Sequence, residues 1–283
     1  METAASICSR IPTPGMSDTT SEPFDRLKYL RQAVDWMNDT QGNLQEEDEY
    51  SCKLCKNRGY TISLEYCEEL KDWYRVSHPC VCANTRASIG RMKASGLKNI
   101  ISDYAFDKFQ ATSDWQKALK QKAMDYAENP HGWFFVGGQP GSGKTHICTA
   151  ICRELLLQGK TVRYMCWRNE IVKLKACLTD IQAYEQLIEP FQNAPVLYID
   201  DFFKTGKGAG TAAQRPTSAD INAAFEIVNY RYNNPDMLTI FSSELTEDEL
   251  MDIDEAIGSR IYERAQAVTI ARDRSRNYRL RKR

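Results

Sequence analysis

The sequence contains no apolar run long enough to cross a membrane, and its first residues lack the basic and apolar parts of a signal peptide. These absences argue against a membrane or secreted protein and predict a cytoplasmic one. Net charge is also small, −1 over 283 residues, with 42% hydrophobic and 27% charged residues. Such values are typical of an ordinary soluble protein, and this length suggests about two domains.

Although the net charge is small, the two ends of the chain have opposite charge. Residues 1–50 hold ten acids and four bases, a net −6, whereas residues 271–283 hold seven bases and one acid, a net +6. The acidic end suits a protein partner, while a basic cluster around Tyr278 suits a phosphate backbone and a stacked base. A frayed, solvated terminus explains the basic tail equally well.

A complete phosphate-binding motif of the form GxxxxGK[ST] lies in the middle of the chain. It consists of Gly138, Gln139, Pro140, Gly141, Ser142, Gly143, Lys144 and Thr145, and His146 follows. The apolar residues 133–136 precede it, which predicts a strand, a loop and a helix that aim backbone N–H groups at the phosphates of ATP or GTP. We expect Lys144 to neutralise the β- and γ-phosphates and the Thr145 hydroxyl to bind Mg²⁺.

A second motif ends in two carboxylates, Asp200 and Asp201, directly after the apolar residues 196–199. The pattern predicts a buried parallel strand that delivers both acids to the carboxyl edge of the sheet, where nucleotides bind. Asp200 would hold the Mg²⁺ shell, and Asp201 would orient or deprotonate the attacking water.

Ten cysteines in a reducing compartment indicate metal binding rather than disulfides, and five lie between residues 52 and 82. Four of them, Cys52, Cys55, Cys80 and Cys82, can close a tetrahedral Zn²⁺ site. Cys67 lies among acids that disfavour its thiolate, so it ranks lower, and His78 is a spare ligand. Reduced cysteines without metal are the alternative.

The remaining pattern predicts an α/β fold. Apolar residues at helical spacing over 24–37 predict a helix, which must bury on the zinc module or, as we favour, on a partner. Residues 38–50 are polar and acidic and predict a linker. Strands are expected at 133–136, 161–166, 196–199, 238–241 and 267–270, with helices at 144–158, 169–187 and 219–232. This alternation predicts a parallel sheet between helices.

Residues 50–283 resemble the DnaC/DnaI-type replicative helicase loaders, a branch of the AAA+ ATPases close to the IstB transposition helpers. The ordered set of motifs carries the resemblance: the cysteine pairs, residues 91–97 and 104–109, the phosphate loop, the Asp-Asp strand, and residues 227–232 with 239–243. It implies a helical and zinc-binding helicase-interaction domain at 21–99 and an AAA+ P-loop domain at 100–283, and we expect residues 1–20 to be disordered.

The resemblance also implies a function. The chain would use ATP and Mg²⁺ to load a hexameric replicative DNA helicase onto single-stranded DNA, with hydrolysis regulating assembly and release. It would self-associate through AAA+ interfaces and contact no membrane. Three site residues follow from the family's motifs. Glu244 stands at the sensor 1 position, where relatives carry Asn or Asp. Arg264, or second Arg260, would reach the γ-phosphate of a neighbouring subunit, and Arg279 would act as a sensor 2-like residue in cis.

Other functions remain open. An IstB-like helper of a transposase shares the ATPase body, a small-molecule kinase shares the phosphate loop, and a zinc adaptor would keep the nucleotide only as a structural element. Between the two motifs, aromatic and basic residues interleave in a pattern that suits single-stranded DNA. They are Tyr164, Trp167, Arg168, Lys173 and Lys175. They could equally be core aromatics and a solvated helix face, which we favour slightly for Tyr164.

Overall fold

The computed structural model describes residues 24–205 and 215–280. The expectations for residues 1–20 and for residues 281–283 of the basic tail therefore lie outside the described residues. The chain forms two compact units, one of Met1–Asp39 with Ile62–Ser77 and one of Thr40–Thr61 with His78–Arg283. Residues 40–61 and 78–99 thus belong to the same compact unit as residues 100–283. The two compact units therefore do not meet at the domain boundary expected after residue 99. The functional division at that residue stays a prediction.

The first unit combines a helix with most of a two-stranded sheet. Helix α1 (Arg26–Asp39) carries the predicted apolar stripe, and β1 (Tyr60–Cys67) pairs with β2 (Asp72–Pro79). Val34 is buried, and the Asn38 side chain exchanges two hydrogen bonds with the backbone of Ile62, at 2.7 and 3.0 Å. This end of α1 therefore contacts the hairpin between the two cysteine pairs, which agrees with the zinc-module alternative of the sequence analysis.

The second unit contains the parallel sheet that the alternating pattern predicts. Its strands are β3 (Trp133–Gly138), β4 (Val162–Cys166), β5 (Val196–Phe202), β6 (Leu238–Ser243) and β7 (Ala265–Ile270). Their order among the described residues is β4-β5-β6-β3-β7, and every pair is parallel. The phosphate loop follows β3, which pairs with one side of β6, and the Asp-Asp motif lies at the end of β5, which pairs with the other side of β6. Both motifs therefore reach the same edge of the sheet.

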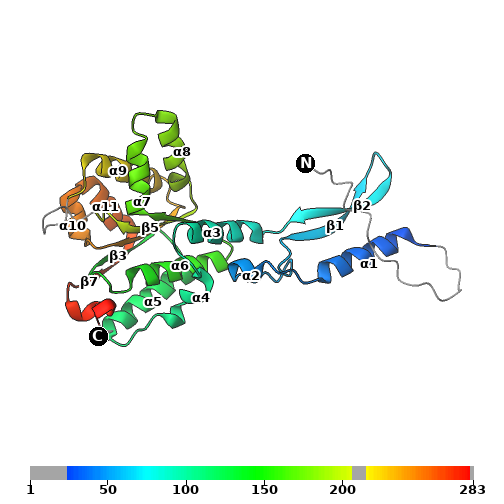
Figure 1. The fold of residues 1–283 in the computed structure, drawn as a ribbon, viewed down its shortest axis with the longest axis horizontal. Coiled ribbons are helices and arrows are strands. Elements are labelled where there is room, and N and C mark those ends of the chain that lie inside the picture. Colours follow the sequence, from blue (N-terminus) through cyan, green and yellow to red (C-terminus); the bar gives the residue numbers. More distant parts are fainter. Residues whose placement is uncertain (1–23, 206–214, 281–283) are drawn as a thin grey trace. The chain divides into compact units, whose positions relative to one another are not determined.

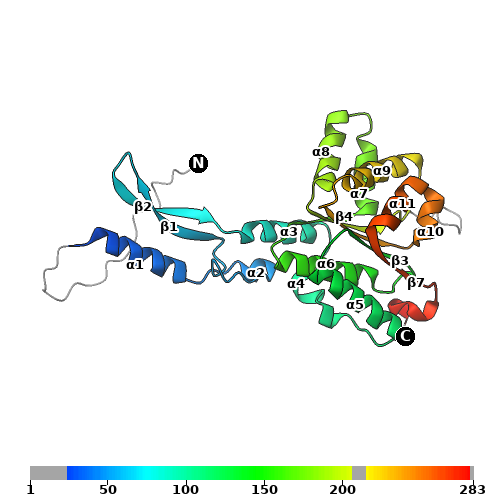
Figure 2. The ribbon, with the colours of Figure 1, turned by 180° about the vertical axis from the view of Figure 1, so that it is seen from behind.

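Helices cover both faces of this sheet, as Figures 1 and 2 show. One face packs against α3 (Cys82–Ala94), α4 (Ile100–Asp103), α5 (Asp114–Glu128) and α6 (Lys144–Leu157). The other packs against α7 (Trp167–Ala176), α8 (Ile181–Gln192), α9 (Ser218–Tyr232), α10 (Glu247–Ile253) and α11 (Glu255–Arg264). The short elements are α2 (Gln45–Asp48), η2 (Phe106–Lys108), η3 (Arg274–Arg276) and η4 (Tyr278–Leu280). The expected α/β architecture is confirmed.

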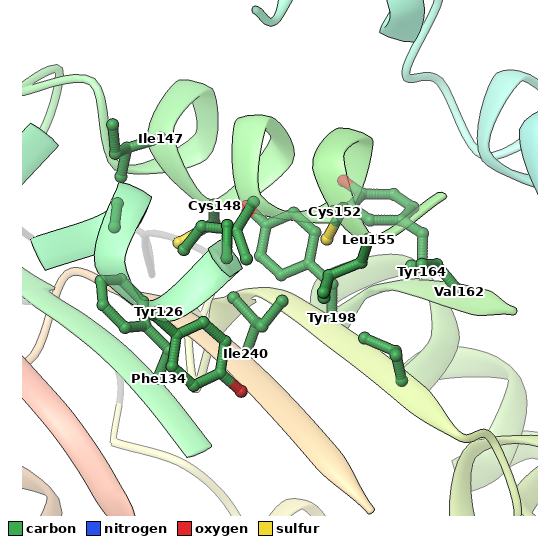
Figure 3. Close-up of a cluster of buried hydrophobic side chains, with 14 of the residues drawn as sticks. Tyr126, Phe134, Ile147, Cys148, Cys152, Leu155, Val162, Tyr164, Tyr198 and Ile240 are labelled. Carbon is green, nitrogen blue, oxygen red and sulfur yellow. The ribbon is translucent and has the colours of Figure 1, made fainter. Parts of the chain in front are cut away.

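Alternate residues of each strand enter the two cores. Figure 3 shows part of the first core, where Phe134 lies beside Tyr126 and Ile240, and Tyr198 lies between Ile240 and Tyr164. The neighbouring residues of the same strands, such as Trp133 and Phe241, enter the second core. Burial on both faces explains why these strands are continuous apolar runs rather than alternating ones.

The single helix expected over residues 169–187 is wrong, because the chain forms two. Helix α7 ends at Ala176, and α8 begins at Ile181 after Asp180, whose carboxylate accepts a hydrogen bond from the Ala183 N–H at 3.0 Å. An aspartate at an N-cap satisfies a backbone donor that a continuous helix would not leave free. The sequence signal for the break was therefore this capping aspartate.

Candidate nucleotide site and cysteine cluster

The phosphate loop joins β3 to α6 with the geometry its glycines permit. Gly138 has φ +105° and Gly141 has φ +71°, and a Cβ at either position would lie 2.1 Å from another residue's oxygen. These are Ile270 O and Asn277 Oδ1, respectively. Positive φ and close approach both demand glycine. The loop is thus packed under the segment after β7, where the Tyr278 N–H donates to Gly141 O at 2.9 Å.

Lys144 is the first residue of α6 and is nearly buried. Its ammonium donates to the carbonyl oxygens of Gly138 at 2.9 Å and Gln139 at 2.8 Å. Burial lowers the pKa of Lys144 to about 8, although nearby Glu244 and Asp201 oppose this shift. A buried cation at a helix N-terminus favours an anion such as phosphate beside it.

The remaining loop residues hold one another. The Ser142 hydroxyl donates to Gln139 O at 2.8 Å, the Gln139 N–H donates to Ile270 O at 3.2 Å, and the Gln139 side-chain amide donates to Pro140 O at 3.3 Å. The loop is therefore fixed by its own residues and by β7.

Asp200 is buried and accepts hydrogen bonds from several elements at once. The hydroxyls of Tyr198 and Tyr164 donate to its carboxylate at 2.8 and 3.0 Å, and Thr145 Oγ1 lies 3.1 Å from Oδ1. The Ser242 hydroxyl, at the end of β6, donates as well. These donors fix the carboxylate beside the threonine, as a shared cation site requires. Burial and the Asp200 charge raise the pKa of both tyrosines, so the phenols stay protonated.

Asp201 has a different environment from its neighbour, because β5 bulges at this point. The pairing with β6 shifts between Ile199 and Phe202, and Asp201 adopts φ 56°. A non-glycine residue in this region is uncommon and is held here by its N–H bonds to Asp200 Oδ1 at 3.1 Å and Ser242 Oγ at 3.2 Å. The bulge turns the Asp201 side chain away from the buried hydroxyls that hold Asp200.

A cavity of about 490 Å³ opens beside the loop. It brings together most of the predicted site residues, namely Gly141, Gly143, Lys144, Thr145, His146, Asp201, Glu244 and Arg279. Tyr104, Phe109, Lys204 and Tyr278 also line the cavity, although the sequence analysis assigned none of them to the nucleotide site. Its polar end holds the loop lysine and the acids, and aromatic side chains line another part, which suits a phosphate chain carrying a planar base.

His146 belongs to the aromatic part of the cavity. Its ring lies 5.3 Å from that of Tyr104 and 5.6 Å from that of Phe109, and burial lowers its pKa. Phe109 also meets Tyr278 edge-on at 6.4 Å. Arg279 reaches the cavity from η4, where its backbone N–H donates to Asn277 Oδ1 at 3.0 Å.

The two arginines proposed to act on a neighbouring subunit lie on α11, outside the cavity. Arg264 and Arg260 stack on the Tyr232 ring, with guanidinium carbons 4.9 and 5.2 Å from its centre. Arg264 also donates to Tyr232 O at 3.3 Å. Neither arginine lines the cavity of its own chain, and their role stays a prediction.

The aromatic residues expected to stack on DNA between the two motifs belong to the core. Tyr164 is buried against Asp200, and Trp167 is 1% exposed between Phe202 and Phe203. The alternative explanation is therefore correct for both. Among the basic residues, Arg168 and Lys173 are exposed, although Lys173 pairs with Glu170 at 2.8 Å, and Lys175 pairs with Asp220 at 3.0 Å.

The predicted cysteine quartet forms a compact group. All four sulfur atoms of Cys52, Cys55, Cys80 and Cys82 are buried and lie within 4.8 Å of one another. The sulfur atoms of Cys52 and Cys80 are 3.8 Å apart, and those of Cys55 and Cys82 are 3.6 Å apart. Tetrahedral thiolate ligands about 2.3 Å from zinc would be about 3.8 Å apart, so the spacing fits. Neither Cys67 nor His78 belongs to this group within the described part of the chain.

Local hydrogen bonds hold the cysteines of the cluster in place. The Gly59 N–H donates to Cys55 Sγ at 3.3 Å, and the Cys52 N–H donates to Asn57 Oδ1 at 2.7 Å. Against the effect of burial, the Gly59 donor and the neighbouring thiols lower the pKa of the Cys55 thiol, whereas burial raises the pKa of Cys80 and Cys82. Arg86 pairs with Asp48 and also donates to Asn57 at 3.1 Å. These bonds suit thiolates that hold a metal.

Comparisons with known proteins identify the family of this chain. The model of the family "IstB-like ATP binding protein" matches residues 82–283, most of the chain. The chain belongs to the IstB-like ATP-binding family. The uncharacterized protein YqaM of Bacillus subtilis (strain 168) is 32% identical over 259 residues, which cover 87% of this chain and 79% of YqaM. The predicted resemblance to the IstB/DnaC-like family is confirmed.

Two further members of this comparison concern DnaC. The replicative helicase loader DnaC of Escherichia coli (strain K12) is 31% identical over 111 residues, which cover 38% of this chain and 45% of DnaC. A crystal structure of the DnaC helicase loader superposes with a TM-score of 0.53 and 20% identity, over 62% of this chain and 99% of that one. The structural match shows a shared AAA+ fold.

No described helix is long and apolar enough to span a membrane.

Proposed function

We propose that this protein binds ATP with Mg²⁺ and hydrolyses it at the cavity beside the phosphate loop. One observation carries the proposal: a single cavity joins the loop lysine and threonine to Asp201, with Asp200 directly behind Thr145. Loop N–H groups and Lys144 would bind the phosphates. Thr145 and Asp200 would hold Mg²⁺, which supplies charge neutralisation when bound. Asp201, turned out by the bulge, would orient or deprotonate the attacking water.

The other site residues complete this proposal. Glu244 follows β6 and lines the cavity. Through a neighbouring side chain, it would act on the attacking water or on the terminal phosphate. Arg279 would bind phosphate in cis, and Arg264, with Arg260 as the alternative, would reach the nucleotide of the next subunit. Tyr104, Phe109 and His146 would pack against the base. Loop residues Gly138 to His146 would form the remaining contacts.

We further propose that Cys52, Cys55, Cys80 and Cys82 hold one structural Zn²⁺. The support is their burial and spacing, which leave no ligand position for water. A closed four-thiolate shell stabilises the local fold and does not take part in chemistry.

At the level of the cell, we propose that the protein loads a replicative DNA helicase onto single-stranded DNA. The similarity to the helicase loader DnaC supports this role, as does the opposite charge of the two ends. Residues 21–99 would bind the hexameric helicase. Within them, Phe24 and Trp36 are 75% and 66% exposed on or beside α1, available to a protein partner. Residues 100–283 would self-associate, and they would bind the DNA backbone through exposed basic side chains such as those of Arg168 and Lys173.

The family model favours one alternative, a helper ATPase that serves a transposase. A helicase loader and a transposase helper would both hydrolyse ATP without a phosphate acceptor, so only the identity of the protein partner distinguishes these two functions. A small-molecule kinase would need an acceptor, and a zinc adaptor would not hydrolyse ATP at all.

The test is co-purification of the full chain with the replicative helicase of its host, with ATP, together with phosphate release in the presence and absence of single-stranded DNA. The matched control is Lys144→Ala, which should lose both nucleotide binding and hydrolysis. We expect capture of helicase and hydrolysis stimulated by helicase or DNA. Capture of a transposase but not of helicase would replace the loader role by the transposition role.

A further inference from the structure

Lys204 is a charged residue of the cavity that none of the sequence motifs includes. It lies three residues after Asp201, at the end of the turn that follows the bulge, and its N–H donates to Asp201 O at 2.9 Å. Its ammonium lies 3.0 and 3.2 Å from the two carboxylate oxygens of Asp201 and 2.9 Å from Glu244 Oε1. One cation thus joins the two acids that face the cavity.

The turn that carries Lys204 is held in place. Phe203 adopts φ 57° and is buried, and its ring packs on Phe202 at 4.3 Å and on Trp167 at 5.4 Å. Residues kept in such backbone conformations by their surroundings occur mainly at functional sites. The buried aromatic group therefore fixes the start of the Lys204 side chain beside the cavity.

The charges of the cavity explain why a second cation is needed. The carboxylates of Asp201 and Glu244 line the same space as Lys144. A terminal phosphate entering beside these two acids would meet like charges, whereas the α- and β-phosphates would lie at the loop and the N-terminus of its helix. Burial tends to lower the pKa of Lys204, but its hydrogen bonds to Glu244 and Asp201 outweigh this and raise it. Lys204 therefore remains protonated.

We propose that Lys204 is a ligand of the terminal phosphate of a bound nucleoside triphosphate, a contact that rests on the proposed nucleotide site. An ammonium carries three donors on a flexible stem, so it can keep one carboxylate and offer a donor to a phosphate oxygen. It then offsets the repulsion from Asp201 and Glu244 and lets the site distinguish a triphosphate from a diphosphate, which has no group at this position.

The test compares two affinities in the full chain, one for ATPγS and one for ADP, both with Mg²⁺. In Lys204→Met, ATPγS should bind roughly tenfold more weakly, because a charge-assisted hydrogen bond contributes about that factor, while ADP should bind as in wild type. The matched control is Lys117→Met. Lys117 forms an exposed ion pair with Asp114 at 3.5 Å. The two residues are three positions apart in sequence, as Lys204 and Asp201 are.

ADP affinity also reports whether the variant is folded. An unchanged ratio of the two affinities in Lys204→Met, whether both fall together or neither falls, would overturn the proposal. If the wild-type protein binds neither nucleotide, the proposed nucleotide site itself is wrong, which is a different result.

Discussion

The two candidate sites of the larger unit differ in how they are closed. In the cysteine cluster, four sulfur atoms face one another and are all buried. In the nucleotide site, only Asp200 is enclosed by hydroxyl donors, whereas Asp201 and Glu244 line an open cavity. A closed ligand shell suits a permanent structural metal, and an open one suits a ligand that enters, reacts and leaves. The distinction lies in the environment of each group and not in its residue type.

The largest effect should come from opening the closed site. Cys80→Ser removes a sulfur ligand, so zinc content should fall from one ion per chain toward zero and residues 40–61 should lose protection from hydrogen exchange, because structural zinc contributes folding free energy directly. The control is Cys152→Ser, a buried cysteine of the sheet core outside the cluster, which should keep its zinc. Normal zinc content in Cys80→Ser would remove Cys80 from the ligand set.

A chelator should separate the two sites without mutation. Brief treatment with EDTA should stop ATP hydrolysis at once, and added Mg²⁺ should restore it, because the Mg²⁺ ligands border an open cavity. Zinc should stay bound over the same period, since its ligands are buried. The measurement is phosphate release with metal analysis of the same sample. Loss of zinc as fast as loss of activity would contradict the closed shell.

A smaller effect is expected from the hydroxyls that hold Asp200. Tyr198→Phe removes one donor, and the Mg²⁺ concentration for half-maximal hydrolysis should rise by about tenfold, the lower end of such second-shell effects. Tyr126→Phe is the matched control, since its buried hydroxyl donates to Gly132 O at 3.1 Å, away from the site. Both tyrosines lie in the core of Figure 3. Equal Mg²⁺ dependence of the two variants would show that Tyr198 only stabilises the fold.

Sequence patterns predicted the parts of this molecule that depend on local chemistry. The phosphate loop, the Asp-Asp strand and the cysteine quartet all have spacings set by one ligand, so the residues could be named in advance. The donors to Asp200 could not be named, because Tyr164 and Tyr198 read as ordinary strand residues until parallel pairing placed β4 beside β5. Lys204 was missed for a similar reason, since only the bulge at Asp201 brings it back to Glu244.

The most direct test of the account compares ATP binding and hydrolysis in Asp201→Asn. The substitution keeps the size of the side chain, so ATP should bind with nearly wild-type affinity, while hydrolysis should fall by at least about a hundredfold, as expected when a residue that acts on water in the transition state is lost. Filter binding and phosphate release on one preparation measure both. Binding with hydrolysis abolished is the predicted result. Full turnover by Asp201→Asn would contradict the assignment of Asp201 as the residue that handles the water.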